Sequence, residues 1–292
     1  MGPARNGKVM KTIRIIPRFD IKGPNLVKGV QLEGLRTLGK PDQFAQMYYH
    51  DGADELLYMD VVASLYGRNS LESFITHTAK EIFIPLTVGG GLRSLQDIQK
   101  VLHAGADKVA LNTAAVNRPE LIKEASREFG SSTILVSIEA LKLAEGKYEV
   151  LVENGREKTG VDVFDWARQA ADLGAGEILV TSINREGTGE GFDIPLVRTI
   201  AQSVSIPVIA GGGAGRLEDI AEVIIDGKAD AVSIASILHY HYVQRIAVDQ
   251  NAFEEGNMEF LKHRKTSKKI DGASLEEIKN FLFQKNIHVA FA

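Results

Sequence analysis

Short apolar runs of strand length recur along the chain and are separated by stretches with helical periodicity. Their apolar character at consecutive positions is typical of strands buried on both faces of a parallel sheet. Eight such runs occur, at residues 13–16, 55–59, 82–88, 108–111, 133–138, 177–181, 206–210 and 231–234. Helical patterns lie between them, for example at 119–129 and 163–173. This alternation predicts an α/β protein with the (β/α)8 TIM-barrel fold.

The second half of the chain repeats the first. Residues 84–115 read IPLTVGGGLRSLQDIQKVLHAGADKVALNTAA, and residues 206–237 read IPVIAGGGAGRLEDIAEVIIDGKADAVSIASI. The second copy follows the first by about 122 residues, which is the length of half a barrel. The repeat therefore predicts two half-barrels related by a pseudo-twofold axis. Each half carries a glycine triplet directly after a strand.

Four segments fall outside the alternating pattern. Residues 23–40 read as a long loop after the first strand, and residues 142–158 as a hairpin inserted after the fifth, with Asn154-Gly155 as its turn signal. Residues 243–272 form a charged insertion before a final helix at 275–283, and a solvated surface would explain their charge. Residues 1–11 read as a polar N-terminal arm. We expect one barrel domain over residues 1–292.

Composition narrows the possible partners and compartments. Hydrophobic residues make up 44% of the 292 residues and charged residues 25%, as in an ordinary globular protein. The net charge of -4 gives no reason to expect nucleic acid or an anionic membrane as a partner. The chain has no cysteine, so disulfides and thiolate metal sites are excluded. No apolar run has the length of a membrane span, and we expect a cytoplasmic protein.

Candidate catalytic residues come from the predicted carboxyl ends of the strands, where such barrels carry their active sites. The first strand ends in Asp20 and the fifth in Glu139, which are equivalent positions in the two halves. Two carboxyl groups facing each other suit general acid–base catalysis, although a lone Asp at a strand end is often only a loop cap. Lys28 lies on the glycine-containing loop after Asp20, where it could close over an anionic substrate or be a solvated charge.

The glycine triplets predict two phosphate sites. Backbone N–H groups without side chains can approach an anion closely, and a following helix adds its dipole. One triplet alone is often only a tight turn, but here each is matched by a small polar loop after the next strand. The predicted residues are Gly90, Gly91, Asn112 and Thr113 in the first site, and Gly187, Gly212, Gly213, Ala235 and Ser236 in the second. We therefore expect a small-molecule substrate with a phosphate at each end.

Four charged residues begin predicted strands at the opposite end of the barrel: Arg14, Glu55, Lys108 and Glu177. Inward-facing residues of alternate strands lie in layers, so these two acids and two bases could form a paired ring across the barrel floor. A purely structural salt-bridge layer is the simpler interpretation of their spacing.

These features together resemble the cyclase subunit of imidazole glycerol phosphate synthase. The resemblance covers residues 14–239 and 275–289 and includes the segments RIIPRFDIKGPNLVKG, DELLYMDVVAS, TVGGG, GADKVALNTAA, GAGEILVTSI, GGGAG and ASILH. It implies a lyase of histidine biosynthesis without a metal or other cofactor. Ammonia from a glutaminase, docked as a heterodimer partner at the N-terminal face, would react with a bisphosphorylated formimino-aminoimidazole carboxamide ribonucleotide. The products would be imidazole glycerol phosphate and aminoimidazole carboxamide ribonucleotide.

The resemblance also assigns roles to individual residues. Asp20 corresponds to the first catalytic aspartate, Lys28 to a mobile-loop lysine, and the glycine-loop residues to phosphate ligands. It turns the charged ring into an ammonia gate and makes Asp107 a residue that faces the partner.

The chain departs from the family pattern at its chemical end. Glu139 replaces the second catalytic aspartate, Asn184 and Glu186 replace aspartates after the sixth strand, and Arg18 replaces a cysteine. The 243–272 insertion is also atypical. Two alternatives follow: a paralogue that delivers ammonia for the amidination of a surface sugar, and a non-catalytic activator of a glutaminase.

Overall fold

A computed structural model describes residues 11–63, 72–245 and 269–291. Within them, parallel strands close into a barrel in which each strand pairs with the next and β10 pairs with β7. The strands are β1 (Arg14–Lys22), β4 (Leu56–Asp60), β5 (Leu86–Gly89), β6 (Lys108–Leu111), β7 (Ile134–Ala144), β10 (Glu177–Ser182), β11 (Val208–Gly211) and β12 (Ala231–Ile234). The predicted (β/α)8 barrel is therefore confirmed.

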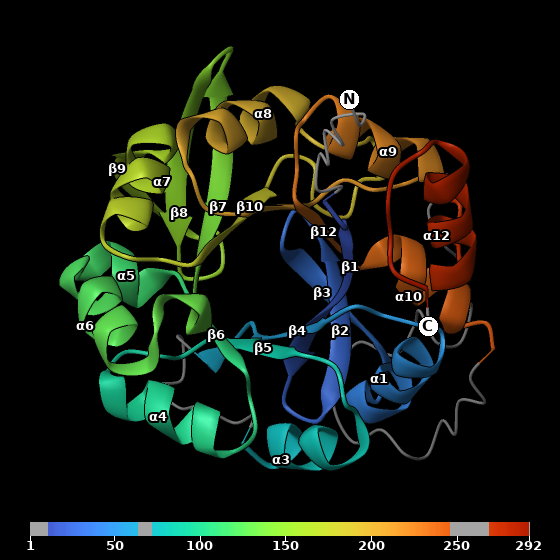
Figure 1. Ribbon diagram of the computed structural model, residues 1–292, viewed down its shortest axis with the longest axis horizontal. Coiled ribbons are helices and arrows are strands. Elements are labelled where there is room, and N and C mark those ends of the chain that lie inside the picture. Colours follow the sequence, from blue (N-terminus) through green and yellow to red (C-terminus); the bar gives the residue numbers. More distant parts are fainter. Residues whose placement is uncertain (1–10, 64–71, 246–268, 292) are drawn as a thin grey trace, which may run out of the picture.

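Helices connect the strands and surround them (Figure 1). The helices are α1 (Pro41–His50), α3 (Glu72–Glu81), α4 (Leu95–His103), α5 (Thr113–Asn117), α6 (Glu120–Phe129), α7 (Val163–Asp172), α8 (Ile194–Ser203), α9 (Leu217–Ile225), α10 (Ser236–Tyr242) and α12 (Leu275–Gln284). Local sequence explains several of their starts, because Ser94, Asp162 and Ser274 accept hydrogen bonds from the first-turn N–H groups of α4, α7 and α12.

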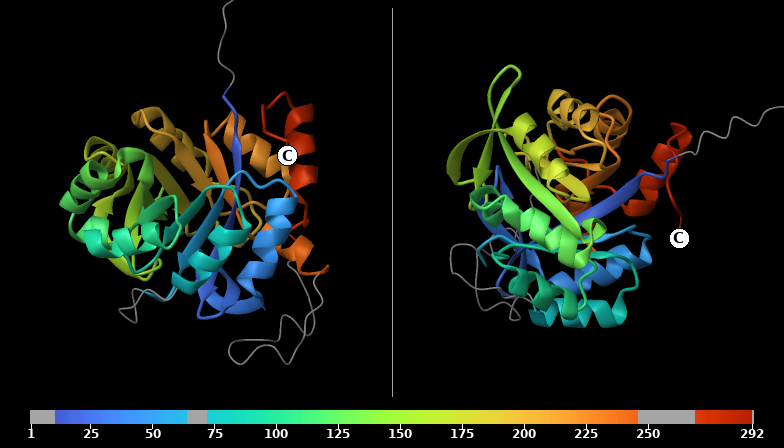
Figure 2. Two further views of the ribbon diagram at one scale, coloured as in Figure 1. Left: turned by 60° about the horizontal axis from the view of Figure 1, so that its bottom comes forward. Right: turned by 60° about the vertical axis from the view of Figure 1, so that its left-hand side comes forward.

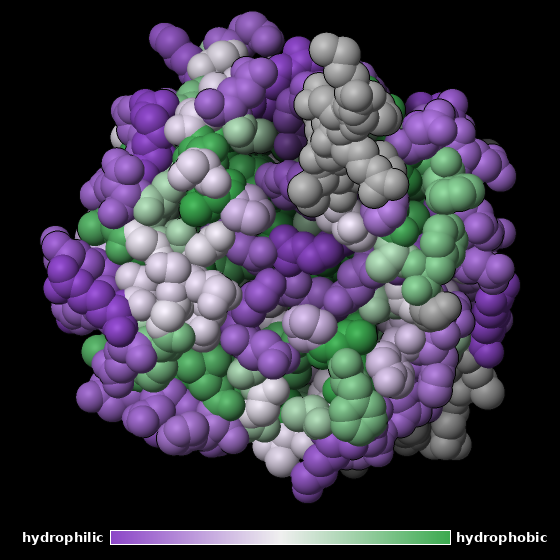
Figure 3. Space-filling model, in the orientation of Figure 1, coloured by the Kyte–Doolittle hydropathy of each residue, from purple (hydrophilic) through white to green (hydrophobic). Residues whose placement is uncertain are grey.

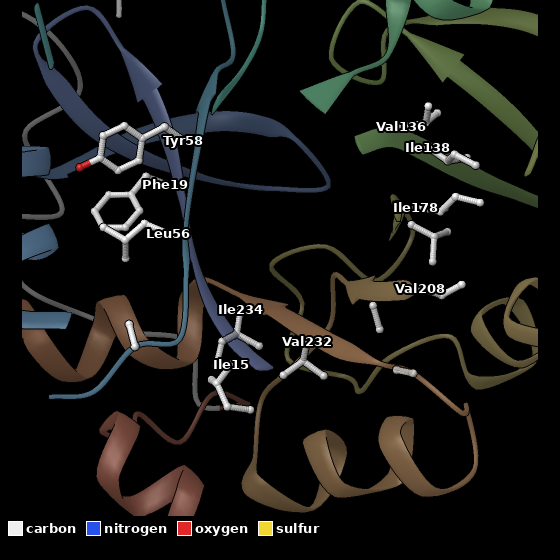
Figure 4. Close-up of a cluster of buried hydrophobic side chains, with 14 of the residues drawn as sticks. Ile15, Phe19, Leu56, Tyr58, Val136, Ile138, Ile178, Val208, Val232 and Ile234 are labelled. Carbon is white, nitrogen blue, oxygen red and sulfur yellow. The ribbon is translucent and has the colours of Figure 1, made fainter. Parts of the chain in front are cut away.

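Side chains alternate between the two sides of the barrel wall. On β1, Ile15 and Phe19 point outward into the core beneath the helices, whereas Ile16 points into the barrel. Figure 4 shows this outer core, with Phe19 beside Tyr58. The inner cluster is a separate apolar layer across the barrel, which consists of Ile16, Val27, Leu57, Met59, Val61, Ala110, Leu135, Leu179, Ile209 and Ala231. The position of an inward-facing residue along its strand therefore decides where it lies in the barrel: at the C-terminal mouth, in the middle layer or at the N-terminal floor.

The internal repeat has a conformational basis in the glycine triplets. Gly90 and Gly91 have φ angles of 98° and 71°, and Gly212 and Gly213 have φ angles of 85° and 117°. These φ values are positive, and glycine adopts them without the steric strain that a side chain would cause. A Cβ on Gly90 would also come within 2.3 Å of the carbonyl oxygen of Asp60. The same two-glycine turn thus ends β5 and β11, as the half-barrel repeat predicts.

The prediction of a loop over residues 23–40 was wrong. These residues form an antiparallel ribbon of β2 (Asn25–Val30) and β3 (Glu33–Gly39), which continues from β1. Gln31 and Leu32 make the two-residue turn with φ angles of 53° and 64°. Two-residue hairpin turns of type I′ require positive φ at both positions, and asparagine and glycine are the residues that usually indicate them. Their absence concealed the hairpin in the sequence.

A second antiparallel extension follows the fifth barrel strand. β7 continues to Ala144 and is followed by β8 (Lys147–Val152) and β9 (Glu157–Asp162), which makes three strands where the sequence indicated one hairpin over 142–158. The tip between β7 and β8 projects from the molecule (Figure 2). Two other predicted segments, the 1–11 arm and the 243–272 insertion, lie largely outside the described residues.

Candidate active site

The two predicted catalytic carboxyl groups lie on opposite walls of the barrel. Asp20 belongs to β1 and Glu139 to β7, and three strands separate them on one side. Each is only 3% exposed. Both are inward positions near the carboxyl ends of those parts of β1 and β7 that belong to the barrel, where barrel enzymes carry out their chemistry.

Two cations hold Asp20. The Arg18 Nε lies 2.8 Å from Asp20 Oδ1, and the Lys28 Nζ lies 3.5 Å from Asp20 Oδ2. Burial alone would raise the pKa of Asp20, but the combined charges of Arg18 and Lys28 outweigh it and lower the pKa. Asp20 is therefore ionised at neutral pH.

Glu139 has the opposite tendency. Burial raises its pKa to about 7, against the positive charge of Arg18, which lowers it. Its Oε2 atom is buried and has no hydrogen-bond partner among the described residues. One carboxyl group thus favours the ionised form and the other retains a proton near neutrality, as a base and an acid in one site require.

Lys28 lies on strand β2, where the sequence predicted a loop, and it is 2% exposed. Besides Asp20 it pairs with Glu186, which lies in the loop after β10. Burial lowers the pKa of Lys28, although Asp20 raises it. The backbone N–H of Gln31 donates to the Glu186 carbonyl oxygen at 2.8 Å, so the β2–β3 hairpin is fastened to this loop. Glu186 was noted in the sequence only as a departure from a family motif.

His239 fixes the strand that carries Arg18 and Asp20. Its Nε2 lies 2.9 Å from the Arg18 carbonyl oxygen, and its Nδ1 lies 2.6 Å from the Tyr48 hydroxyl. Since a carbonyl only accepts, Nε2 carries the hydrogen and Nδ1 accepts from Tyr48. Burial lowers the pKa of His239 to about 3, so the ring is neutral. Sequence reasoning missed this residue, because a buried histidine has no distinctive spacing.

The first predicted phosphate site is open. Gly90, Gly91, Asn112 and Thr113 line a cavity of about 320 Å3 that also reaches Glu139. The Asn112 Oδ1 atom there is buried and has no partner in the part of the chain that the structure describes. The sequence analysis missed further residues that line this cavity, namely Arg93, Arg118, Glu153 and Asn154. Glu153 and Asn154 arrive through the β8–β9 turn, which the Glu153 N–H joins to Thr113 Oγ1 at 3.1 Å.

The second predicted phosphate site is nearly full. Its lining includes the predicted Gly187, Gly212, Gly213, Ala235 and Ser236, but the space among them is only about 10 Å3. Arg18, Glu186 and Ser233 also line it. The two halves of the barrel therefore differ at these equivalent places, although their backbones turn in the same way.

The four charged residues at the other end form a closed ring. Arg14 donates to Glu55 at 2.8 Å and to Glu177 at 2.7 Å. Lys108 donates to the same two carboxylates at 3.0 and 3.1 Å. The structure thus brings all four predicted residues together at the strand N-termini, beneath the apolar layer.

Asp107 lies exposed beside this ring and has a structural contact. Its Oδ2 accepts from the Leu86 N–H at 2.9 Å. Asp54 and Asp230 accept in the same way from the N–H groups of Ile15 and Val208. The contact is therefore part of the repeated architecture at the floor of the barrel.

The described residues contain neither a membrane-spanning helix nor a metal-binding cluster. No helix there is long and apolar enough to cross a membrane, and no group of histidines and acids there is arranged to hold a metal ion. On the face shown in Figure 3, polar side chains separate small hydrophobic patches.

The fold and the paired carboxyl groups at its mouth define the class, an enzyme built on a (β/α)8 barrel. Residues 14–244 match the family model described as "Histidine biosynthesis protein". The chain is 57% identical to the imidazole glycerol phosphate synthase subunit HisF of Legionella pneumophila over 72% of this chain and 99% of that protein. It is 44% identical to the HisF subunit of Alkaliphilus metalliredigens (strain QYMF) over 84% of this chain and 97% of that protein. The chain belongs to the HisF family of imidazole glycerol phosphate synthase subunits.

Proposed function

We infer that this chain is the ammonia-dependent cyclase of imidazole glycerol phosphate synthase, a lyase of histidine biosynthesis. The observation that carries the inference is the pair of buried carboxyl groups on opposite walls with opposite proton affinities, beside a glycine-lined cavity. Its substrate is the bisphosphorylated formimino-aminoimidazole carboxamide ribonucleotide, and each glycine loop takes one phosphate.

The carboxyl groups divide the proton transfers of the reaction. Ionised Asp20 accepts protons from the incoming ammonia and from the intermediates, and protonated Glu139 donates to the leaving side of the substrate. Lys28, held beside Asp20, neutralises part of the substrate's negative charge. The first cavity opens directly onto Glu139, so a phosphate anchored at Gly91 would bring the substrate within reach of this acid.

A glutaminase supplies the ammonia from the N-terminal face. Without any cysteine, the chain lacks the usual nucleophile for cleaving glutamine. The ring of Arg14, Glu55, Lys108 and Glu177 stands between that face and the barrel interior, and its ion pairs must part for ammonia to pass. Exposed Asp107 lies beside the ring, where a docked partner would meet it.

The comparisons favour this function over the two alternatives. Both relatives are named as imidazole glycerol phosphate synthase subunits, and neither name refers to a sugar. A non-catalytic glutaminase activator would have no use for two buried carboxyl groups that cost free energy to keep inside the barrel.

Turnover with ammonia tests the proposal. The isolated chain, given the phosphoribulosyl substrate and saturating ammonium near neutral pH, should form imidazole glycerol phosphate, and glutamine should not replace ammonium. Adding a HisF-family glutaminase should restore glutamine use. A folded chain that activates the glutaminase but does not turn over this substrate with ammonium would overturn the cyclase assignment.

A further inference from the structure

We propose that Arg18 and Ser233 belong to the second phosphate site, and that Glu186 occupies this site until the phosphate of the substrate displaces it. The inference rests on the proposed function for the identity of the ligand. The site itself can be tested with inorganic phosphate alone, without turnover.

Glu186 stands where an anion would lie. Its Oε2 atom is 3.1 Å from the position a Cβ on Gly212 would take, so the carboxylate rests against the glycine turn itself. Its other oxygen, Oε1, pairs with Lys28. The side chain is buried and bridges a glycine turn and a lysine, as a bound phosphate would.

Little space remains for a phosphate beside Glu186. About 10 Å3 is left in this site, against about 320 Å3 in the first site. A phosphate group needs more room than a single water molecule, so its entry has to displace a neighbouring side chain. Glu186 is the only anionic side chain among the described residues that line the site.

Two hydroxyl groups in this site have no partner in the part of the chain that the structure describes. The Oγ atoms of Ser233 and Ser236 are buried and lack hydrogen bonds among the described residues. A buried hydroxyl without a partner costs free energy, which a ligand oxygen would recover. Ser233 is an inward position of β12, in register with Ile16 of the neighbouring β1 and two residues below Ala235.

Arg18 supplies the second cation. The residue is 3% exposed and lines the second site, and its guanidinium donates to Asp20 and to Thr181 Oγ1 at 2.8 and 3.2 Å. A guanidinium presents several donors in a rigid fork and can bind a carboxylate and a phosphate at once. When phosphate replaces Glu186, Lys28 and Arg18 both face the incoming dianion. Their other anion, Asp20, stays in place.

The experiment follows phosphate binding at the two sites separately. Amide signals of Gly91 and Gly213, recorded by NMR on the full chain during titration with inorganic phosphate, report on the first and second site. In the unaltered chain the second site should require at least about tenfold more phosphate than the first, a difference of roughly 1.4 kcal/mol. In Glu186→Gln, which keeps the size but removes the charge, the second site should tighten about tenfold and the first should change less than twofold.

Controls separate this exchange from general charge effects. Glu190 is an exposed carboxylate of the same loop that pairs with Lys269, and Glu190→Gln should leave both sites unchanged. Ser233→Ala should weaken only the second site while leaving the unliganded chain equally or more stable, because it removes a hydroxyl without a partner. Glu186→Ala, which also vacates the space, should tighten the second site at least as much as Glu186→Gln.

If the affinity of the second site for phosphate were unchanged in both Glu186 variants, the proposed displacement of Glu186 would be wrong. If it were unchanged in Ser233→Ala, Ser233 would not be a phosphate ligand. These outcomes are independent of the cyclase assignment, because a chain that binds phosphate as described but fails the ammonia assay would contradict only the proposed function.

Discussion

At the scale of single residues, the environment rather than the residue type separates the two carboxyl groups of the site. Asp20 lies between Arg18 and Lys28, and Glu139 lies in a buried position with one oxygen that has no partner among the described residues. Glu139 has one methylene more than the aspartate that the family pattern carries at this position. Arg18, which replaces a cysteine of the family pattern, lowers the pKa values of both groups, and it donates a hydrogen bond to Asp20.

Replacing Asp20 tests the base. Asp20→Asn keeps the shape of the side chain but cannot accept a proton, so ammonia-dependent turnover should fall about 10²–10⁴-fold. Binding of inorganic phosphate at Gly91 serves as the control and should persist, because Asp20 does not line that cavity. Full activity with ammonium in Asp20→Asn would remove this residue from the proton transfers.

The raised pKa of Glu139 should make stability depend on pH. Between about 4.5 and 7 the folded chain keeps a proton that the unfolded chain has lost, so the free energy of unfolding falls as pH rises. The shift amounts to roughly 3 kcal/mol once pH exceeds 7. Glu139→Gln removes this loss, so its stability relative to the unaltered chain should rise by roughly that amount between pH 4.5 and 8.

Urea unfolding at the two pH values measures this difference. Glu157→Gln, an exposed carboxyl group on β9, is the matched control and should show no such change with pH. Parallel pH profiles for Glu139→Gln and the unaltered chain would mean that Glu139 is already ionised in the folded protein.

At the scale of elements, close backbone contact holds the β2–β3 hairpin against the loop after β10. A Cβ on Gly187 would lie 2.5 Å from the Gly29 carbonyl oxygen. Gly187 also has a φ angle of 71°. The loop after β10 thus fits against the hairpin only because it carries glycine at this point, and the contact keeps Lys28 beside Asp20.

Gly187→Ala should therefore push the hairpin away from the site. We expect kcat/KM to fall about 10–100-fold, since Lys28 would be misplaced, and proteolysis to cut the β2–β3 hairpin faster. Gly146→Ala is the control, because Gly146 has a similar φ of 68° but open space where its Cβ would lie. It should show only the strain of about 1 kcal/mol, with unchanged kinetics. Equal kinetic effects of both variants would contradict the role of this contact.

At the scale of the whole molecule, the barrel joins two chemically different ends through an apolar layer. The ring of ion pairs lies at the strand N-termini and the carboxyl pair at the strand C-termini, with Ile16, Leu57 and Leu179 between them. A neutral molecule such as ammonia crosses such a layer more easily than a charged one does. The polarity of the barrel thus suits delivery of ammonia from one face to chemistry at the other.

Lys108→Ala should impair the delivery of ammonia from the glutaminase but not the chemistry at the carboxyl pair. It removes half of the cationic charge of the ring, so glutamine-dependent turnover with the glutaminase should fall at least about tenfold while ammonia-dependent turnover changes less than about twofold. The ammonia reaction is its own control, because any general loss of folding would lower both. Equal losses with the two nitrogen donors would leave Lys108 as a structural ion pair and no more.

Much of this arrangement follows from the sequence because parallel barrels obey simple periodic rules. Alternation along a strand places Arg14, Ile16, Arg18 and Asp20 in one inward column, and the repeat places Glu139 opposite. The fold, the glycine turns and the four-residue ring could be predicted because each depends on local spacing repeated over the chain. The β2–β3 hairpin escaped prediction because its turn lacks the usual residues.

Only the tertiary structure decided how the side chains of the site share their partners. Several contacts of the site join residues that are distant in the chain, and no spacing rule connects such residues. They are the pairing of Lys28 with Glu186, the contact of Arg18 with Thr181 and the hydrogen bond of His239 to β1. The sequence determined two equivalent glycine turns from a duplicated half-barrel. In the folded chain the phosphate site at the first turn is open and the site at the second turn is nearly full, because burial and charge depend on neighbours that differ between the two halves.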